Sequence, residues 1–312
     1  PKIAANSHNG FSASMRSRKR SMRLRSSEAG VLHSIRIGGL RWYLALAEAR
    51  SAGVYNATRR SMAMEIPFVF TMHEGLPRQG PGSNACTRKA FSMLTNLPAR
   101  PEILDIGCGS GMQTIELART CPSCRITATD IHQPFLADLV RRAASAGLGD
   151  RITTVRASMD DLPFSDASFN VLWAEGSIFI VGFKEGLLSW RRLLRPGGYL
   201  CLTESVWFTE DPSPEAAAFW NDCYPAITTV AANRAIAEDA GYKVVATFPL
   251  PASAWWENYY VPVLKRIDDL RPKVTGNPEA KAQIEFAERE IAVYREHGNE
   301  YGYEFFILRK EE

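Results

Sequence analysis

The stretch ILDIGCGSGMQT, residues 103–114, decides the fold. An apolar run meets three glycines in five positions, and an amphipathic segment follows. Glycine accepts positive φ and lets a ligand approach the backbone without a Cβ in the way. A helix N-terminus adds N–H groups that lack a partner inside the helix. The stretch therefore predicts a strand, a tight turn and a helix, with a cofactor lying against the turn.

The spacing of the glycines excludes two cofactor classes. A dinucleotide-binding G-x-G-x-x-G would need its third glycine at Met112, and the chain has no G-x-x-x-x-G-K-[ST] phosphate loop. Asp105 stands two residues before Gly107, where a carboxylate would repel a pyrophosphate. The same carboxylate could pair with a cationic amino group of a ligand, or it could hydrogen-bond within the loop.

Three further motifs follow in order. The second strand ends at Asp130 in ITATDIHQ, then come SMDDLPFSDASFNVLWAEG from Ser158 and LLSWRRLLRPGGYLCLTE from Leu187. With LDIGCGSG they make residues 66–250 similar to class I S-adenosylmethionine-dependent methyltransferases. The similarity is to the small-molecule branch that includes the ubiquinone/menaquinone-biosynthesis C-methyltransferases.

The resemblance implies S-adenosyl-L-methionine as cofactor and names the residues that would bind it. In the family, the acid that ends the second strand holds the ribose hydroxyls, and the motif after the third strand holds the adenine. From the residues alone, Asp130 could instead be a helix N-cap. The expected cofactor contacts are Asp105, Gly107, Cys108, Gly109, Gly111, Asp130, Ile131, Met159, Asp160 and Glu175.

The chain departs from the family pattern at two positions. Ser158 replaces the acid that opens the adenine motif, which leaves the Met159 backbone and the Asp160 carboxylate to contact adenine. Asn170 replaces the usual acid of S-F-D and is expected to be structural. No N-P-P-Y or D-P-P-Y follows the fourth strand, which argues against methylation of amino groups on nucleic-acid bases.

Two residues are candidates for a catalytic base. Glu175 follows the fourth strand, at the edge where open α/β sheets bind ligands. His73 lies in TMHEGLPRQGPG, a loop with Arg78 and Gln79 that either is rigid or closes over cofactor and acceptor. A base is needed only when the nucleophile carries a proton, so neither residue is required by the chemistry alone.

Strands and helices alternate after Met64, which predicts an α/β fold. We expect a Rossmann-like, seven-stranded, mostly parallel sheet with helices on both faces and a helical, aromatic lid. The expected strands are 102–106, 125–129, 152–156, 169–174, 198–204, 243–248 and 303–308. The expected helices are 83–96, 111–119, 134–146, 184–193 and 232–240.

Charge divides the chain in two. Residues 1–61 hold 12 Lys or Arg and 2 Asp or Glu, a net +10, which leaves −7 for residues 62–312 of the total +3. The first segment is expected to be a disordered basic extension or a targeting segment, and the second a methyltransferase domain with lid insertions near 205–231 and 250–298. The acidic body argues against a broad nucleic-acid-binding face on the core domain.

The cysteines favour a reduced compartment. Six thiols at irregular spacing suit no disulfide framework, and the lone Cys121-Pro-Ser-Cys124 lacks a second pair for zinc, so no metal is expected. No apolar run is long enough to span a bilayer. These features favour a cytoplasmic protein, with organellar import through the basic segment as the alternative, and they leave a homodimer open.

The function expected from these observations is methyl transfer from S-adenosylmethionine to a small-molecule acceptor. Two alternatives remain open: an RNA or protein methyltransferase that uses the basic arm, and an S-adenosylmethionine-binding protein without catalysis. The aromatic residues near 207–224 and 255–260 are expected to pack in the core or to line an acceptor pocket.

Overall fold

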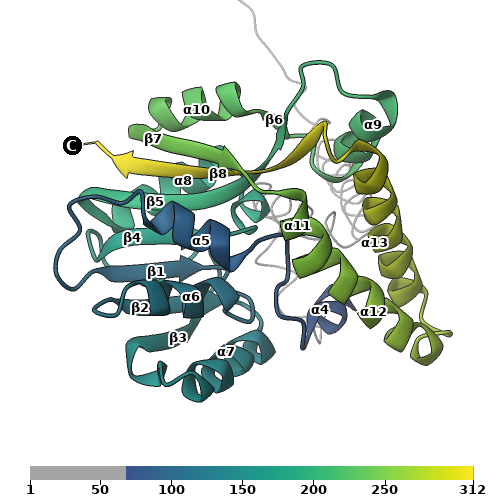
Figure 1. Cartoon of the computed structure of the whole chain (residues 1–312), viewed down its shortest axis with the longest axis horizontal. Helices are drawn as coiled ribbons and strands as arrows, with labels where there is room; N and C mark the ends of the chain where they lie inside the picture. Colours follow the sequence, from purple (N-terminus) through teal and green to yellow (C-terminus); the bar gives the residue numbers. More distant parts are fainter. Residues whose placement is uncertain (1–67, 312) are drawn as a thin grey trace, which may run out of the picture. The chain divides into compact units, whose positions relative to one another are not determined.

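The computed structural model describes residues 68–311, within a compact unit that comprises Met62–Glu312. The predicted extension 1–61 lies outside the described residues. In the described part, strands and helices alternate as the sequence predicts (Figure 1). The strands are β1 Glu102–Ile106, β2 Arg125–Asp130, β3 Ile152–Arg156, β4 Phe169–Ala174, β5 Leu194–Trp207, β6 Thr228–Thr229, β7 Tyr242–Pro249 and β8 Tyr301–Lys310.

The strands form one mixed sheet in the order β3-β2-β1-β4-β5-β8-β7. Only β8 runs antiparallel to its neighbours, so the sheet is mostly parallel. The two-residue strand β6 pairs with the end of β5 and adds an eighth strand beside the expected seven. The expected Rossmann-like fold class is confirmed.

Helices cover both faces of this sheet. On one face lie α5 Asn84–Phe91, α6 Met112–Thr120 and α7 Gln133–Ser145, and on the other α8 Phe183–Trp190 and α10 Val230–Asp239 (Figure 1). The core beneath α8 and α10 is built from alternate residues of the strands, among them Leu104, Leu172 and Leu202, which are fully buried. Strands buried on both faces form nearly continuous apolar runs, which is why the sequence predicted their positions.

A group of helices lies at the carboxyl ends of the parallel strands (Figure 1). We call it the helical cap. It consists of α4 Phe68–His73, α9 Pro214–Cys223, α11 Ala252–Trp255, a π-helical turn Trp256–Tyr260, α12 Val261–Leu270 and α13 Pro278–His297. Within it α4 packs against α12 and α13, and α13 packs against α9. Much of the cap comes from the two segments that the sequence predicted as insertions; its action as a lid stays a prediction.

Element boundaries differ from expectation in two places. The helix capped by Ser83 ends at Phe91, with Ser92 as its C-cap, and does not extend to Asn96, which has a left-handed φ of +59°. The fifth strand begins at Leu194 and runs to Trp207, because its pairing with Phe169 continues across the Arg-Pro-Gly-Gly segment through an irregularity. Glu204 consequently lies inside a long paired strand and not at its end.

None of the helices in residues 68–311 is long and apolar enough to cross a membrane.

Candidate active site

The bend between β1 and α6 can be built only with glycine. Gly107 and Gly109 have φ of +70° and +53°. A Cβ on Gly107 would lie 2.7 Å from the Ser177 Cβ, and one on Gly109 would lie 2.2 Å from the Gln79 Oε1. The sequence predicted that a cofactor lies close to these glycines. Two side chains of this chain, Ser177 and Gln79, also lie close to them. They fix the bend (Gly107, Cys108, Gly109, Ser110 and Gly111) before any ligand binds.

The loop of residues 74–82 packs on that bend. The Ser110 N–H donates to the Gln79 Oε1 at 2.7 Å, and the Ser110 hydroxyl lies within hydrogen-bond distance of the Leu76 and Pro77 carbonyls. At the start of the loop, the His132 ring meets the Glu74 carboxylate at 2.8 Å. Loop 74–82 is thus bound to the turns that follow β1 and β2.

Asp105 lies on β1 directly beneath the bend and is fully buried. Its Oδ2 accepts a hydrogen bond from the Thr114 hydroxyl at 2.5 Å. Its Oδ1 has no hydrogen-bond partner among the residues that the structure describes. Burial raises the pKa of the Asp105 carboxyl to about 7, against the opposing effect of the Thr114 hydroxyl. A buried acceptor without a partner is costly, which suits an atom reserved for a cationic ligand.

Asp130 ends β2 and joins that strand to the bend. Its Oδ2 accepts from the Gly109 N–H at 2.9 Å, and its Oδ1 accepts from the His132 N–H at 2.8 Å. Burial raises the pKa of Asp130 although these N–H groups favour the charged form. Each oxygen keeps a lone pair for another donor. The N-cap of α7 is His132 and not Asp130, so the helix-cap alternative is wrong; Asp130 instead accepts the N–H of that N-cap residue. Its neighbour Ile131 is 43% exposed.

The structure brings Met159 to the bend but leaves Asp160 on the surface. The Met159 Cε would be 3.2 Å from a Cβ on Gly107, and the Met159 carbonyl accepts from the Trp190 indole N–H at 2.8 Å. Asp160 is exposed and bonds the Ser158 hydroxyl. Ser158, which stands where the family has an acid, thus holds the Asp160 carboxylate in place.

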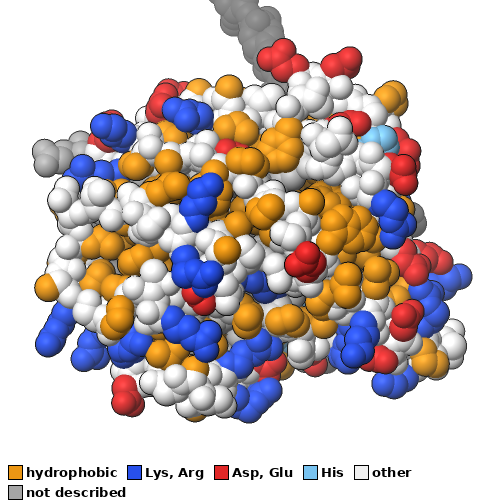
Figure 2. All heavy atoms as spheres, viewed as in Figure 1, with side chains coloured by type: hydrophobic (Ala, Val, Ile, Leu, Met, Phe, Trp, Pro, Cys, Tyr) orange, Lys and Arg blue, Asp and Glu red, His pale blue; other side chains and the backbone are white. Residues whose placement is uncertain are grey.

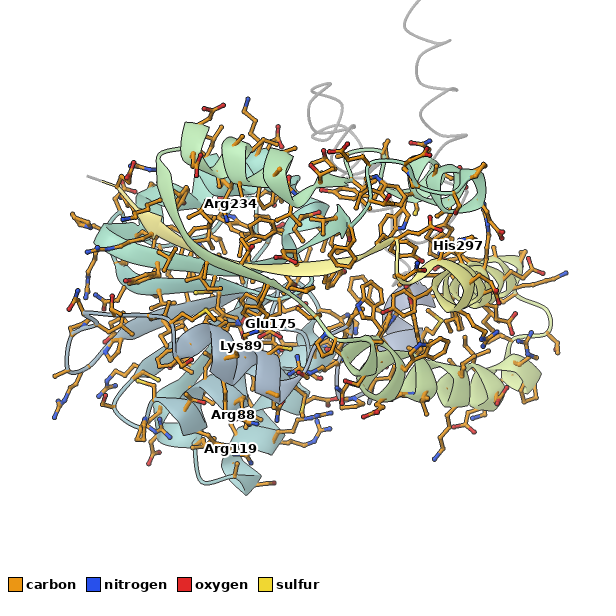
Figure 3. The ribbon with its side chains drawn as sticks, turned by 45° about the horizontal axis from the view of Figure 1, so that its top comes forward. Arg88, Lys89, Arg119, Glu175, Arg234 and His297 are labelled. Atoms are coloured by element: carbon orange, nitrogen blue, oxygen red, sulfur yellow. The ribbon has the colours of Figure 1, made fainter. Side chains whose placement is uncertain are left out.

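The side chain of Glu175, just after β4, is buried beneath α5 (Figure 3). Its Oε2 accepts from the Arg78 guanidinium at 3.0 Å, and its Oε1 accepts from the Thr87 hydroxyl at 2.6 Å and the Trp173 indole at 2.9 Å. The Arg78 and Glu175 side chains are only 7% and 3% exposed. Arg78 also donates to the Asn84 side chain. This charge pair connects loop 74–82 to the carboxyl end of β4.

His73 is the last residue of α4 and contacts another part of the helical cap, the π-helical turn. Its Nδ1–H donates to the Val69 carbonyl at 2.8 Å, which leaves Nε2 to accept from the Tyr259 hydroxyl at 3.2 Å. Burial lowers the pKa of His73, so the ring is neutral near pH 7. Tyr259 lies in the π-helical turn, an element common at functional sites.

One buried acid escaped the sequence analysis. Glu204 on β5 is 2% exposed, and neither of its carboxylate oxygens has a hydrogen-bond partner among the described residues. Burial raises its pKa to about 8. The signal in the sequence was a carboxylate inside an apolar strand, LCLTESV. Because the predicted strand ended at residue 204, the sequence placed Glu204 at a strand end and not in the core.

Comparison with known proteins identifies the region that contains most of this site. Residues 103–198 match the model of a methyltransferase domain family. The chain carries a methyltransferase domain. It begins within β1 and ends in β5, so it includes the bend, Asp105, Asp130, Met159, Asp160 and Glu175. His73, Arg78 and Glu204 lie outside it.

Relatives of the methyltransferase domain include the 27-O-demethylrifamycin SV methyltransferase of Amycolatopsis mediterranei. It is 35% identical over 133 residues, 42% of this chain and 47% of that protein. The fatty-acid O-methyltransferase of Mycolicibacterium smegmatis is 31% identical over 176 residues, 53% of this chain and 63% of that protein. The chain thus spans between about half and two thirds of these two curated relatives.

A solved structure shares the fold over a larger part of the chain. It is a methyltransferase from Geobacter sulfurreducens in complex with S-adenosyl-L-homocysteine, with a TM-score of 0.68 and 22% identity. The match covers 78% of this chain and 98% of that one. It therefore includes more than the methyltransferase domain.

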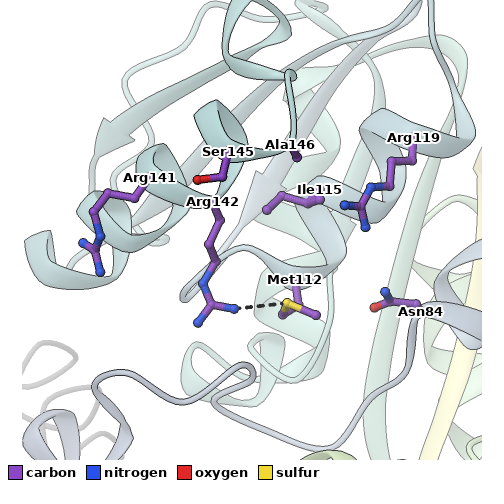
Figure 4. A pocket seen from close by; sticks show the side chains of 8 residues that line it. All are labelled: Asn84, Met112, Ile115, Arg119, Arg141, Arg142, Ser145 and Ala146. Atoms are coloured by element: carbon purple, nitrogen blue, oxygen red, sulfur yellow. Dashed lines mark hydrogen bonds between the residues drawn. The ribbon is translucent and has the colours of Figure 1, made fainter.

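A surface pocket of about 510 Å³ lies away from these residues. It opens between α5, α6 and α7, where Lys and Arg side chains gather in the view of Figure 2. The Arg142 guanidinium donates to the Met112 sulfur within it, while Arg141 points away (Figure 4). None of the expected site residues lines it; its lining is Asn84, Met112, Ile115, Arg119, Arg141, Arg142, Ser145 and Ala146.

Proposed function

We propose that this protein transfers a methyl group from S-adenosylmethionine to an oxygen atom of a small-molecule acceptor. The observation that carries the proposal is the pairing of an unpartnered, buried Asp105 Oδ1 with the fixed glycine bend, inside a methyltransferase domain. The names of the two relatives support oxygen as the atom methylated.

The residues present fit this cofactor. The Asp105 carboxylate would take the amino group of its methionine part, because a buried anion without a partner gains most from a cation. Asp130 would take the ribose hydroxyls with its remaining lone pairs. The backbone of residues 107–111 would lie along the methionine and ribose, and Met159 and Asp160 would contact the adenine.

Methyl transfer requires the protein mainly to position the two reactants. The sulfonium supplies an activated methyl carbon, and an acceptor oxygen must be held in line with it at roughly 3–3.5 Å with water excluded. Loop 74–82 and the helical cap are the elements placed to exclude water. The loop contacts the bend through Gln79 and the end of β4 through Arg78.

Glu175 and His73 remain the sequence-based candidates for a base, but their contacts favour positioning roles. Glu175 accepts three hydrogen bonds, one of them from a guanidinium, so both of its carboxylate oxygens are already engaged. The Nε2 of His73 is engaged by the Tyr259 hydroxyl. We infer that the two residues hold loop 74–82 and the cap against the sheet.

Isothermal calorimetry with S-adenosylhomocysteine tests the proposal first. We expect binding by the wild type, loss of affinity in Asp105→Asn and Asp130→Ala, and no change in the control Asp150→Asn, whose side chain is exposed. Labelled methyl transfer into a metabolite extract then reports the acceptor class. Tight binding of a nicotinamide or flavin ligand, with no heat from S-adenosylhomocysteine, would refute the proposal.

The setting of this activity is also a proposal. We place the protein in the cytoplasm, a reducing compartment, which suits six buried free thiols. The reaction needs neither nucleic acid nor a second copy of the chain. Gel filtration of the full chain, with and without RNA at rising salt, checks both points.

A further inference from the structure

The pocket of about 510 Å³ between α5, α6 and α7 takes no part in the proposed methyl transfer. On α6, its lining residues Met112, Ile115 and Arg119 follow one another at intervals of three and four positions. On α7, Arg142 and Ser145 are three positions apart. Residues at these intervals share one helix face, so the pocket is a groove between one face of α6 and one face of α7. Its volume lies within the range of small-molecule sites, roughly 300–1,000 Å³.

Positive charge dominates the lining of this groove, which holds three arginines and no acid. Arg119 lies 4.0 Å from the Glu116 carboxylate, but Glu116 also pairs with Arg88 and is therefore shared between two cations. In the part of the chain that the structure describes, no Asp or Glu forms an ion pair with Arg142. Asp138, one turn earlier on α7, pairs with the neighbouring arginine instead. An uncompensated guanidinium in a groove attracts an anion.

The hydrogen bonds of Arg142 leave it open to a stronger acceptor. Its Nη1 donates to the Met112 sulfur (Figure 4) and its Nη2 to the Leu76 carbonyl, each at 3.2 Å. A thioether is a weak acceptor, whereas a phosphate oxygen forms a charge-assisted bond with a guanidinium. A phosphate can therefore replace the sulfur on Nη1 while Nη2 keeps the carbonyl. Arg119 points toward the same part of the groove from the side opposite Arg142 (Figure 4), which favours a doubly charged anion.

The Leu76 carbonyl connects Arg142 to the glycine bend. The same carbonyl accepts from the Ser110 hydroxyl at 3.1 Å, and the Ser110 N–H donates to Gln79. Leu76 and Gln79 belong to loop 74–82, which packs on the bend. An anion that holds the Arg142 guanidinium in place should therefore stabilise the loop in this position, and with it the site for the cofactor.

We propose that the groove binds the phosphate monoester of a small organic molecule, and that this binding raises the affinity of the bend for S-adenosylmethionine. The phosphate lies on Arg142 and Arg119, and the organic part lies against Met112 and Ile115. The binding site stands without the proposed function; only its coupling to the cofactor rests on it.

Isothermal calorimetry at constant ionic strength, with phenyl phosphate and inorganic phosphate as probes, tests the site. We expect the wild type to bind phenyl phosphate at least about tenfold more tightly than inorganic phosphate, because only the ester covers Met112 and Ile115. Arg142→Gln should lower the affinity for phenyl phosphate at least about tenfold. Arg141→Gln is the matched control, because it removes the same charge from the same helix, while the Arg141 side chain points away (Figure 4) and pairs with Asp138 at 2.5 Å. It should change this affinity less than about threefold.

A second variant leaves the bond between Arg142 and Leu76 in place. Ser145→Glu adds a carboxylate at an exposed position of the lining. It should lower the affinity for phenyl phosphate at least about tenfold by repulsion. Its affinity for S-adenosylhomocysteine, measured without phosphate, should equal that of the wild type.

The coupling is measured in both directions. Saturating phenyl phosphate should raise the affinity for S-adenosylhomocysteine roughly threefold or more, and S-adenosylhomocysteine should raise the affinity for phenyl phosphate by the same factor. At the concentration that saturates the wild type, phenyl phosphate should have no such effect on Arg142→Gln or Ser145→Glu.

Three outcomes would overturn the site: no binding of phenyl phosphate, equal affinities for the two probes, or equal losses in Arg141→Gln and Arg142→Gln. An affinity for S-adenosylhomocysteine that phenyl phosphate leaves unchanged would overturn the coupling. Binding of phenyl phosphate by a protein that gives no heat with S-adenosylhomocysteine would refute the proposed function and support the site.

Discussion

The guanidinium of Arg78 and the carboxylate of Glu175 form a buried ion pair, with Nη1 and Oε2 3.0 Å apart. Ninety-six residues separate them in the sequence, and the pair joins loop 74–82 to the carboxyl end of β4. Thr87 and Trp173 complete the partners of Glu175, and Asn84 bonds Arg78. The position of the loop over the glycine bend therefore depends on a charge pair that water does not screen.

Breaking this pair from one side should cost more than removing both charges. We expect Arg78→Met to lower the free energy of unfolding by about 3–5 kcal/mol, because Glu175 is left buried and unpaired. Arg78→Met with Glu175→Gln should recover part of the loss. Urea denaturation of the two single variants and the double variant measures the coupling. A loss below about 1 kcal/mol in Arg78→Met would show that the pair is effectively solvent-exposed.

Cofactor affinity should depend on the ionisation of Asp105. Burial raises its pKa to about 7, and only the ionised form attracts an amino group. Affinity for S-adenosylhomocysteine should therefore be highest above about pH 7 and fall as the pH drops through that value. Asp105→Asn should lower the affinity at least about tenfold and flatten its pH profile. Calorimetry from acid to alkaline pH checks both; a profile unchanged by the substitution would assign Asp105 to the fold alone.

Asp130 should matter for the nucleoside and for the bend together. Asp130→Ala removes the acceptor of the Gly109 and His132 N–H groups, so we expect a loss of about 1–3 kcal/mol in stability and of affinity for adenosine. Asp130→Asn keeps one carbonyl oxygen and should lose less stability. Comparing thermal unfolding with adenosine titration separates the two effects. Unaltered adenosine binding in Asp130→Ala would leave this residue a support of the bend only.

The His73–Tyr259 contact should contribute to the stability of the cap. Tyr259→Phe leaves the His73 Nε2 without its donor, and we expect a loss of about 1–3 kcal/mol with unchanged affinity for S-adenosylhomocysteine. His73→Ala should behave similarly. If instead kcat fell roughly 100-fold or more in His73→Ala while stability held, His73 would be a catalytic base.

Glu204 should make stability depend on pH. Its pKa is about 8 in the folded chain against a reference value of 4.5, so the folded state binds the extra proton between these values. Stability should thus be greatest below the reference pKa and fall as the pH rises through about 8. Glu204→Gln should remove about 5 kcal/mol of this dependence. Asp105 and Glu290, with pKa values near 7, act in the same direction and should persist. An identical slope in Glu204→Gln would mean that water reaches this carboxyl.

The sequence by itself determined the parallel sheet and the bend. Strands buried on both faces are apolar throughout, and positive φ values at alternate positions of a turn favour glycine there. Both features can therefore be recognised locally, at residues 102–111. Asp105 and Asp130 could be predicted for the same reason, since each is placed by its strand. The helix start at Ser83 was equally local, because its hydroxyl accepts the Cys86 N–H.

Only the tertiary structure decided what surrounds these residues. Arg78 meets Glu175 and His73 meets Tyr259, while the Glu204 carboxylate has no hydrogen-bond partner within residues 68–311; no spacing in the chain marks any of the three. Burial and pairing come from segments far apart in sequence that share one sheet edge. The protonation of a carboxyl depends on that surrounding, which local sequence does not encode.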